Sequence, residues 1–148
     1  MSIDHYWLQH QLGLETSSDK HRRMLESVIQ VMNVPPGMPI AHQGREGKSL
    51  FLLRSGRVNV IRKSGEGSEK TISSHAELSI FGELSFFSRE VASATVEADD
   101  YCIVYAIDRD HFHRLMVEAP DLAMSLMTLV VRNLGNVIRR LDSKLARL

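Results

Sequence analysis

The stretch Phe81-Gly82-Glu83-Leu84-Ser85-Phe86-Phe87, followed after a short polar loop by Ala92-Ser93-Ala94-Thr95-Val96, decides how the rest of this chain is interpreted. The first part is typical of a glycine turn that opens a very short helix. The second part, rich in small and β-branched residues, is typical of a strand. Backbone N–H groups at such a helix start point toward one place, which suits a phosphate. An isolated Phe-Gly-Glu is more often an ordinary turn, so its meaning depends on the flanking sequence.

Helical patterns precede this stretch. One short amphipathic helix is predicted over His5–Leu14. A second helix is predicted to begin at Ser17 or Ser18 as its N-cap and to stop at Pro35-Pro36-Gly37. Its apolar residues recur at helical spacing: Met24, Leu25, Val28, Ile29 and Met32.

Between residue 35 and residue 107 the pattern changes to short strands separated by glycine-bearing turns. The predicted strands are Ile40–Gln43, Ser49–Arg54, Arg57–Arg62, Lys70–Ser74, Ala92–Ala98 and Tyr101–Ile107. Many short antiparallel strands of this kind indicate a sandwich or a jelly-roll barrel.

The last third is helical again. Asp108 is a plausible N-cap for a helix over Arg109–Glu118, and Pro120 opens a long final helix that reaches Leu148. Packing on its own barrel is one use of that helix, but its length favours pairing with a second copy. The residues expected in the apolar stripe are Leu126, Val130, Leu134, Val137, Leu141 and Leu148.

The expected fold class is therefore mainly β with flanking helices, as one domain over residues 1–148. Its parts are N-terminal helices in 1–34, a jelly-roll barrel (double-stranded β-helix) in 35–107, and C-terminal helices in 108–148.

The composition of the chain argues against several classes of function. Eighteen basic and eighteen acidic residues cancel, which argues against direct binding of DNA or RNA. The one cysteine, Cys102, lies in an apolar run and is interpreted as a small core residue. No apolar stretch reaches the length of a membrane span, and the N-terminus is too polar for a secretory signal, so a cytoplasmic setting is expected.

Taken together, these pieces resemble the cyclic-nucleotide-binding domain family, as in the sensor domain of catabolite-activator-type proteins. The resemblance covers most of the chain in the family's order. It rests on Pro36-Gly37, Gln43-Gly44, Ser49-Leu50-Phe51-Leu52-Leu53, Ser55-Gly56-Arg57-Val58, Phe81-Gly82-Glu83-Leu84-Ser85 and Ser93-Ala94-Thr95-Val96.

The resemblance implies a regulatory module, not an enzyme, with a phosphate cassette in residues 81–95. It implies that amides near Gly82, Glu83, Leu84 and Ser85 hold a cyclic phosphate, and that the Glu83 carboxylate accepts a bond from the ribose 2′-hydroxyl. The other expected site residues are Phe81, Ser93 and Thr95. The implied ligand is cAMP, cGMP or another cyclic nucleotide, bound between the barrel and the final helix.

One residue departs from the family pattern. Counting from Phe81-Gly82-Glu83, the position of the phosphate-binding arginine falls on Ala92. Loss of that charge costs about 2–3 kcal/mol, roughly thirty- to a hundredfold in affinity. Arg89, three residues earlier in the loop, is the candidate arginine for compensation by reaching back. An alternative is that the chain is a degenerate dimerisation or protein-interaction scaffold that binds no nucleotide.

Other chemistry is less well supported. No strand carries the His-x-His of a cupin metal site, and His42 with His75 is the only credible metal pair. No serine elbow or cysteine–histidine arrangement indicates nucleophilic catalysis. The chain ends at Leu148 without room for a helix-turn-helix domain, so an effector domain or a protein partner is expected elsewhere.

Overall fold

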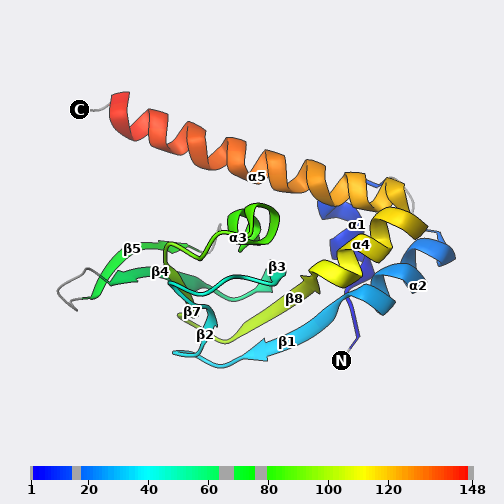
Figure 1. The fold of residues 1–148 in the computed structure, drawn as a ribbon, viewed down its shortest axis with the longest axis horizontal. Helices are drawn as coiled ribbons and strands as arrows, with labels where there is room; N and C mark the ends of the chain where they lie inside the picture. The colour runs from blue at the N-terminus through cyan, green and yellow to red at the C-terminus, as the bar shows by residue number, and fades with distance from the viewer. Residues whose placement is uncertain (1, 15–17, 64–68, 76–79, 147–148) are drawn as a thin grey trace. The chain divides into compact units, whose positions relative to one another are not determined.

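The structure is a computed structural model that describes residues 2–14, 18–63, 69–75 and 80–146. The chain divides into two compact units: residues 28–111, and residues 3–27 together with the segment from Phe112 onward. The first unit contains the described strands and the short helix α3 (Glu83–Ser88), and the second contains the helices near both ends of the chain (Figure 1). The expectation of one domain over residues 1–148 stays a prediction.

The strands form two antiparallel sheets, which confirms the mainly β class of jelly-roll type. The first sheet has the order β1-β8-β3-β6, and its strands are β1 (Gln30–Val34), β8 (Cys102–Asp108), β3 (Ser49–Ser55) and β6 (Ile80–Phe81). The second has the order β2-β7-β4-β5, and its strands are β2 (Pro39–Ala41), β7 (Thr95–Ala98), β4 (Val58–Lys63) and β5 (Glu69–His75).

Buried side chains from both sheets form the core of the first unit. On β7 the burial alternates along the strand, so that Val96 and Ala98 are buried while Thr95 and Glu97 are partly exposed. Such alternation places every second side chain on the inner face. The other buried core members are Val34, Ile40, Leu53, Val58, Phe81, Cys102 and Val104. Cys102 is thus a buried core residue, as its sequence context indicated.

The helices of the second unit are held together by two histidine–carboxylate contacts. The bounds are α1 (His5–Gln11), α2 (Asp19–Val28), α4 (Arg109–Glu118) and α5 (Pro120–Ala146). The His5 Nε2 atom lies 2.8 Å from Oε1 of Glu26 and connects α1 to α2. The His21 Nε2 atom lies 2.7 Å from Oδ2 of Asp121 and connects α2 to α5.

The predicted helix caps are present. Ser18 accepts a hydrogen bond from the His21 N–H at 3.1 Å at the start of α2. Asp108 accepts one from the His111 N–H at 2.8 Å at the start of α4. These bonds satisfy backbone donors that have no partner within the helix. Ser17, the other proposed cap, lies outside the described residues.

The predicted helix up to residue 34 is wrong beyond Val28. Residues Gln30–Val34 form β1, which pairs along its whole length with β8 from Cys102 to Ala106. The apolar spacing of Ile29 and Met32 fits a helix locally, but pairing with a distant strand overrides local preference. The barrel therefore begins at residue 30 and not at residue 35. The two-residue strand β6 was not predicted, and β7 begins at Thr95 and not at Ala92.

The long helix α5 has two different apolar faces, and the described members of the predicted stripe lie on the less exposed one. Leu134 and Val137 are partly buried, whereas the side chain of Leu141 and the whole of Leu148 lie outside the described residues. Leu126 and Val130, which were expected to pair with a second copy, are buried in this structure at 1% and 5% exposure. A separate set of apolar residues on α5 is exposed. Met124, Val131, Ile138 and Leu145 follow one another at intervals of seven residues, and Met127 lies three residues after Met124. Apolar residues seven apart on a helix occupy one position of a heptad repeat, a spacing that is typical of coiled-coil helices.

Candidate functional site

The site begins where β6 ends against β3. Phe81 stacks on Phe51 with ring centroids 5.2 Å apart. The next residue, Gly82, has φ 80° and is the N-cap of α3. A Cβ atom there would lie 3.0 Å from the carbonyl oxygen of Ser49, so a side chain would be both strained and crowded. Glycine at this position lets α3 start directly against β3.

Six of the seven predicted site residues line one cavity of about 200 Å³, here called the cassette cavity. They are Phe81, Gly82, Glu83, Leu84, Ser85 and Ser93. Ala41, Val60, Ile80 and Val96 supply apolar walls. Thr95 is not in this lining, and its hydroxyl oxygen accepts a hydrogen bond from the Gln43 N–H at 3.0 Å. Phe81 is almost fully buried, whereas Leu84 is 67% exposed.

Glu83 is a partly buried residue in the lining of this cavity. Burial raises the pKa of the Glu83 carboxyl, and a hydrogen bond from its own backbone N–H partly offsets that effect. A buried carboxylate is stabilised when it accepts a hydrogen bond. The side chain is therefore suited to accept a bond from a hydroxyl group of a ligand.

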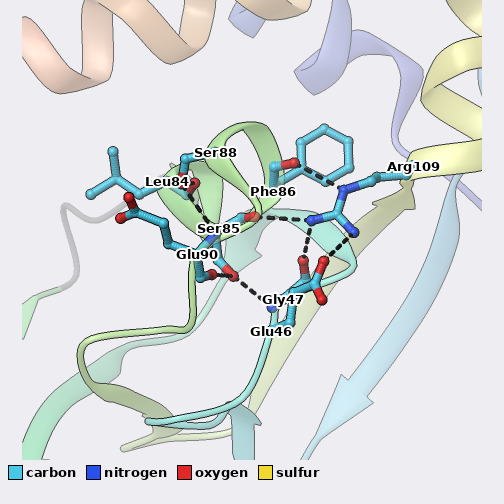
Figure 2. A network of polar contacts seen from close by, with 8 residues as sticks. All are labelled: Glu46, Gly47, Leu84, Ser85, Phe86, Ser88, Glu90 and Arg109. Atoms are coloured by element: carbon cyan, nitrogen blue, oxygen red, sulfur yellow. Dashed lines mark hydrogen bonds and ion pairs between the residues drawn. The ribbon is translucent and has the colours of Figure 1, made fainter.

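Ser85 uses its hydroxyl group within the protein. The side chain is 5% exposed, and its oxygen accepts a hydrogen bond from the Gly47 N–H at 2.6 Å while donating one to the carbonyl of Glu90 at 2.5 Å (Figure 2). A Cβ atom on Gly47 would lie 2.9 Å from that oxygen, so this contact requires glycine. The part of Ser85 that remains for a ligand is its backbone.

Arg109, which the sequence did not single out, fixes the C-terminal half of α3. Its guanidinium donates to the carbonyls of Ser85 and Phe86, each at 3.0 Å, and to the carbonyl of Gly47 at 3.0 Å (Figure 2). It also pairs with Glu46 at 3.1 Å. A signal did exist, because a cation in the first turn of a helix is disfavoured by the helix dipole and needs another reason to be there.

Ala92 lies in a short backbone pairing with the loop after β2. Its N–H donates to the carbonyl of Arg45 at 2.9 Å, and its carbonyl accepts from the Gly44 N–H at 2.9 Å. The methyl group of Ala92 lines the cassette cavity. Arg89 lies at the other end of α3, where it is the exposed C-cap with φ 60°, and it is not in that lining.

A second cavity of about 240 Å³, here called the loop cavity, shares four wall residues with the first. The shared residues are Ala41, Gly82, Ser85 and Ala92. The remaining wall includes three basic side chains from the loop between β2 and β3: His42, Arg45 and Lys48. Ala92 is therefore part of the wall of both cavities.

Comparison with known proteins agrees with this arrangement. The family model for the cyclic nucleotide-binding domain matches residues 31–119. The chain belongs to the cyclic nucleotide-binding domain family. The match includes the barrel, the turn at Gly82 and the helix α4.

Individual relatives of the family are similar over most of this chain. The cyclic AMP receptor protein of Thermus thermophilus is 32% identical over 116 residues, which are 78% of this chain and 54% of that protein. The human potassium/sodium hyperpolarization-activated cyclic nucleotide-gated channel 1 is 28% identical over 102 residues, which are 69% of this chain and 11% of the channel.

Solved structures agree on the fold. The crystal structure of Thermus thermophilus catabolite activator protein has TM-score 0.69 and 29% identity, covering 89% of this chain and 62% of that one. A cyclic nucleotide-binding domain from Methylobacillus flagellatus has TM-score 0.80 and 24% identity, covering 98% and 85%. This cyclic nucleotide-binding domain is thus of the type found in catabolite activator protein, and it spans about half of the Thermus receptor protein.

Two other features of the described residues bear on function. Within the described ranges, no helix is long and apolar enough to cross a bilayer. In the same part of the chain, no three His, Cys, Asp or Glu residues lie together as a metal site would require. The proposed metal residue His75 belongs to β5, for which the backbone alone is described.

Proposed function

We propose that this domain is a non-enzymatic sensor module whose cassette cavity binds a nucleotide. The observation that carries the proposal is the joint lining of one cavity by Gly82–Ser85 and Ser93, with the partly buried Glu83 among them. In this role the backbone of Gly82–Ser85 faces the phosphate, and Glu83 accepts a bond from a sugar hydroxyl. The apolar side chains of Val60, Ile80 and Val96 contact the sugar or the base.

Cyclic AMP and cyclic GMP are the first ligands to test, and Ala92 predicts that they bind weakly. A charge-assisted hydrogen bond to a phosphate contributes about 2–3 kcal/mol, so its loss moves micromolar binding toward millimolar. Position 92 also supports the second candidate function, a scaffold that dimerises and binds a protein partner but no nucleotide.

The exposed seam on α5 supports a homodimer in either case. The seam of Met124, Met127, Val131, Ile138 and Leu145 repeats with heptad spacing and is exposed. Such a seam is stable when a second helix covers it. We place the module in the cytoplasm, with its output passed to an effector domain or a protein partner through this helix.

Calorimetric titration of the purified chain with cyclic AMP and cyclic GMP tests the ligand. Binding that is weakened by Glu83→Gln supports the sensor, because the amide is a poorer acceptor for a sugar hydroxyl. Heat of dilution alone, at ligand concentrations up to several millimolar, contradicts cyclic nucleotide sensing and leaves the scaffold.

Sedimentation analysis tests the dimer. Val131→Glu and Ile138→Glu put charges on the seam and are expected to give monomers. The matched control is Asn136→Glu, which adds the same charge to an exposed position of α5 outside the seam. A monomeric wild-type chain at micromolar concentration contradicts the proposed pairing.

A further inference from the structure

The loop cavity has no role in the function proposed so far, although it adjoins the cassette cavity. The two cavities share Ala41, Gly82, Ser85 and Ala92 as walls. The side chain of Ala92 in this shared wall is a single methyl group. A ligand group placed beside Ala92 can therefore face both the turn at Gly82 and the basic loop.

The loop cavity carries uncompensated positive charge. Among the residues that the structure describes, no carboxylate lies within ion-pair distance of the Arg45 guanidinium or the Lys48 ammonium. The one acidic residue of the lining, Glu46, is paired with Arg109 at 3.1 Å. Two cations beside a partly apolar cavity are expected to attract an anion.

Backbone pairing places the main chain of Arg45, an exposed residue, beside Ala92. The Ala92 N–H donates to the Arg45 carbonyl and the Gly44 N–H donates to the Ala92 carbonyl, both at 2.9 Å. An isolated bridge between Glu46 and Val91 continues the same pairing. Arg45 therefore lies directly across from the position that lacks an arginine, on the neighbouring segment.

We infer that Arg45 and Lys48 bind the phosphate of a phosphomonoester ligand, which reaches past Ala92 from the cassette cavity into the loop cavity. This inference rests on the proposed function, since the nucleoside part of the ligand lies in the cassette cavity. It changes the ligand class from a cyclic nucleotide to a linear nucleoside monophosphate.

Charge and space favour the linear ligand. A phosphomonoester carries a charge of about −1.5 to −2 at neutral pH. A cyclic phosphodiester carries a single negative charge, which one arginine can match. Two cations match the greater charge. A linear phosphate is also joined through one ester bond only, so it can extend away from the sugar into the cavity of about 240 Å³.

Titration of the whole chain with 5′-AMP, 5′-GMP, cyclic AMP and cyclic GMP at fixed low salt tests the inference. We expect at least one linear nucleotide to bind more tightly than its cyclic counterpart. Lys48→Gln and Arg45→Gln are each expected to weaken that binding about tenfold or more while changing cyclic nucleotide affinity less. Arg89→Gln, the matched control, removes an arginine outside both linings and leaves affinity unchanged.

A second measurement uses inorganic phosphate and the amide spectrum of the ¹⁵N-labelled chain. Phosphate is expected to shift the amide signals of Arg45–Ser49 and Ala92 in the wild type. The double variant Arg45→Gln/Lys48→Gln is expected to lose these shifts while keeping the remaining signals, which shows that it is folded.

The outcomes separate the two proposals. Cyclic nucleotide binding that is as tight as linear binding and indifferent to Lys48→Gln and Arg45→Gln overturns the inference while the proposed function stands. Phosphate shifts at the loop without any nucleotide binding overturn both the nucleotide sensor and the nucleoside monophosphate, and leave only an anion site at Arg45 and Lys48. If neither phosphate nor nucleotide changes the spectrum, both are overturned.

Discussion

The two ends of α3 are stabilised by different means. At the C-terminal end, Arg109 donates to the carbonyls of Ser85 and Phe86, and the Arg89 N–H donates to Ser85 as well. At the N-terminal end, Gly82 is the cap, and no side-chain hydrogen bond caps the helix there. One end is thus fixed by the protein itself, while the other end lines a cavity. Hydrogen bonds within the protein thus stabilise the C-terminal end of this short helix, while the proposed ligand contacts lie at its N-terminal end.

Replacing Arg109, which holds the C-terminal end of α3, is expected to have the largest effect, and that effect is on stability. Arg109→Ala deletes three hydrogen bonds to carbonyls and leaves Glu46 without its partner. We expect a loss of about 3 kcal/mol in the free energy of unfolding, measured by urea denaturation. The control is Arg114→Ala, since Arg114 pairs with Glu118 on an exposed helix face and is expected to contribute less than about 1 kcal/mol. Equal losses in both variants would show that the anchor is an ordinary surface contact.

Adding a positive charge near the N-terminal end of α3 is expected to have the next largest effect, on the affinity for cyclic nucleotides. Ala92→Arg places a guanidinium on the wall that both cavities share. We expect cyclic AMP or cyclic GMP to bind about thirty- to a hundredfold more tightly than to the wild type, measured by calorimetry. Ala92→Gln, of similar reach without the charge, is the control. An unchanged affinity in the arginine variant contradicts the position assigned to the phosphate.

Glu83, at the N-terminal end of α3, is expected to make stability depend on pH. Burial raises the pKa of Glu83, so between its ordinary and its raised value the folded state binds more protons than the unfolded state. The contribution of Glu83 to the free energy of unfolding therefore falls as pH rises through that interval. Glu83→Gln removes this decrease, and urea denaturation of both proteins at several pH values above 4 measures it. Parallel stability curves for the two proteins would mean that the carboxyl is well solvated.

Replacing Arg89 is expected to have the smallest effect on stability. This residue has φ 60° at the C-cap of α3, a conformation that glycine adopts without strain. Arg89→Gly is expected to raise the free energy of unfolding by about 0.5–1 kcal/mol in urea denaturation. Nucleotide affinity is expected to stay the same, because the side chain lies outside both linings. Weaker binding in this variant would restore the idea that Arg89 reaches the phosphate.

Local patterns carried most of what could be predicted about the site. Gly82 and the short helix after it follow from residues adjacent in sequence, and so do the capping roles of Ser18 and Asp108. The role of Arg109 could not be read in this way, because it depends on a contact with Gly47, 62 residues away. The same holds for β1, whose residues become a strand only through pairing with β8.

The predicted stripe on α5 was partly wrong for a related reason. Apolar spacing shows that the helix has hydrophobic faces, but it does not say which face the protein itself covers. Leu126 and Val130 are buried, and the exposed repeat at Met124, Val131 and Ile138 is displaced from them around the helix. The two sets differ in burial, which the folded structure shows and the spacing of apolar residues does not.

The backbone pairing of Ala92 with Arg45 has a consequence for how substitutions in such sites are judged. Position-by-position scoring treats alanine at 92 as the removal of a cation from the molecule. Coulomb energy depends on separation and surroundings and is indifferent to which strand supplies the charge. Under the inference above, Arg45 on the neighbouring segment supplies a charge that the alanine at position 92 lacks.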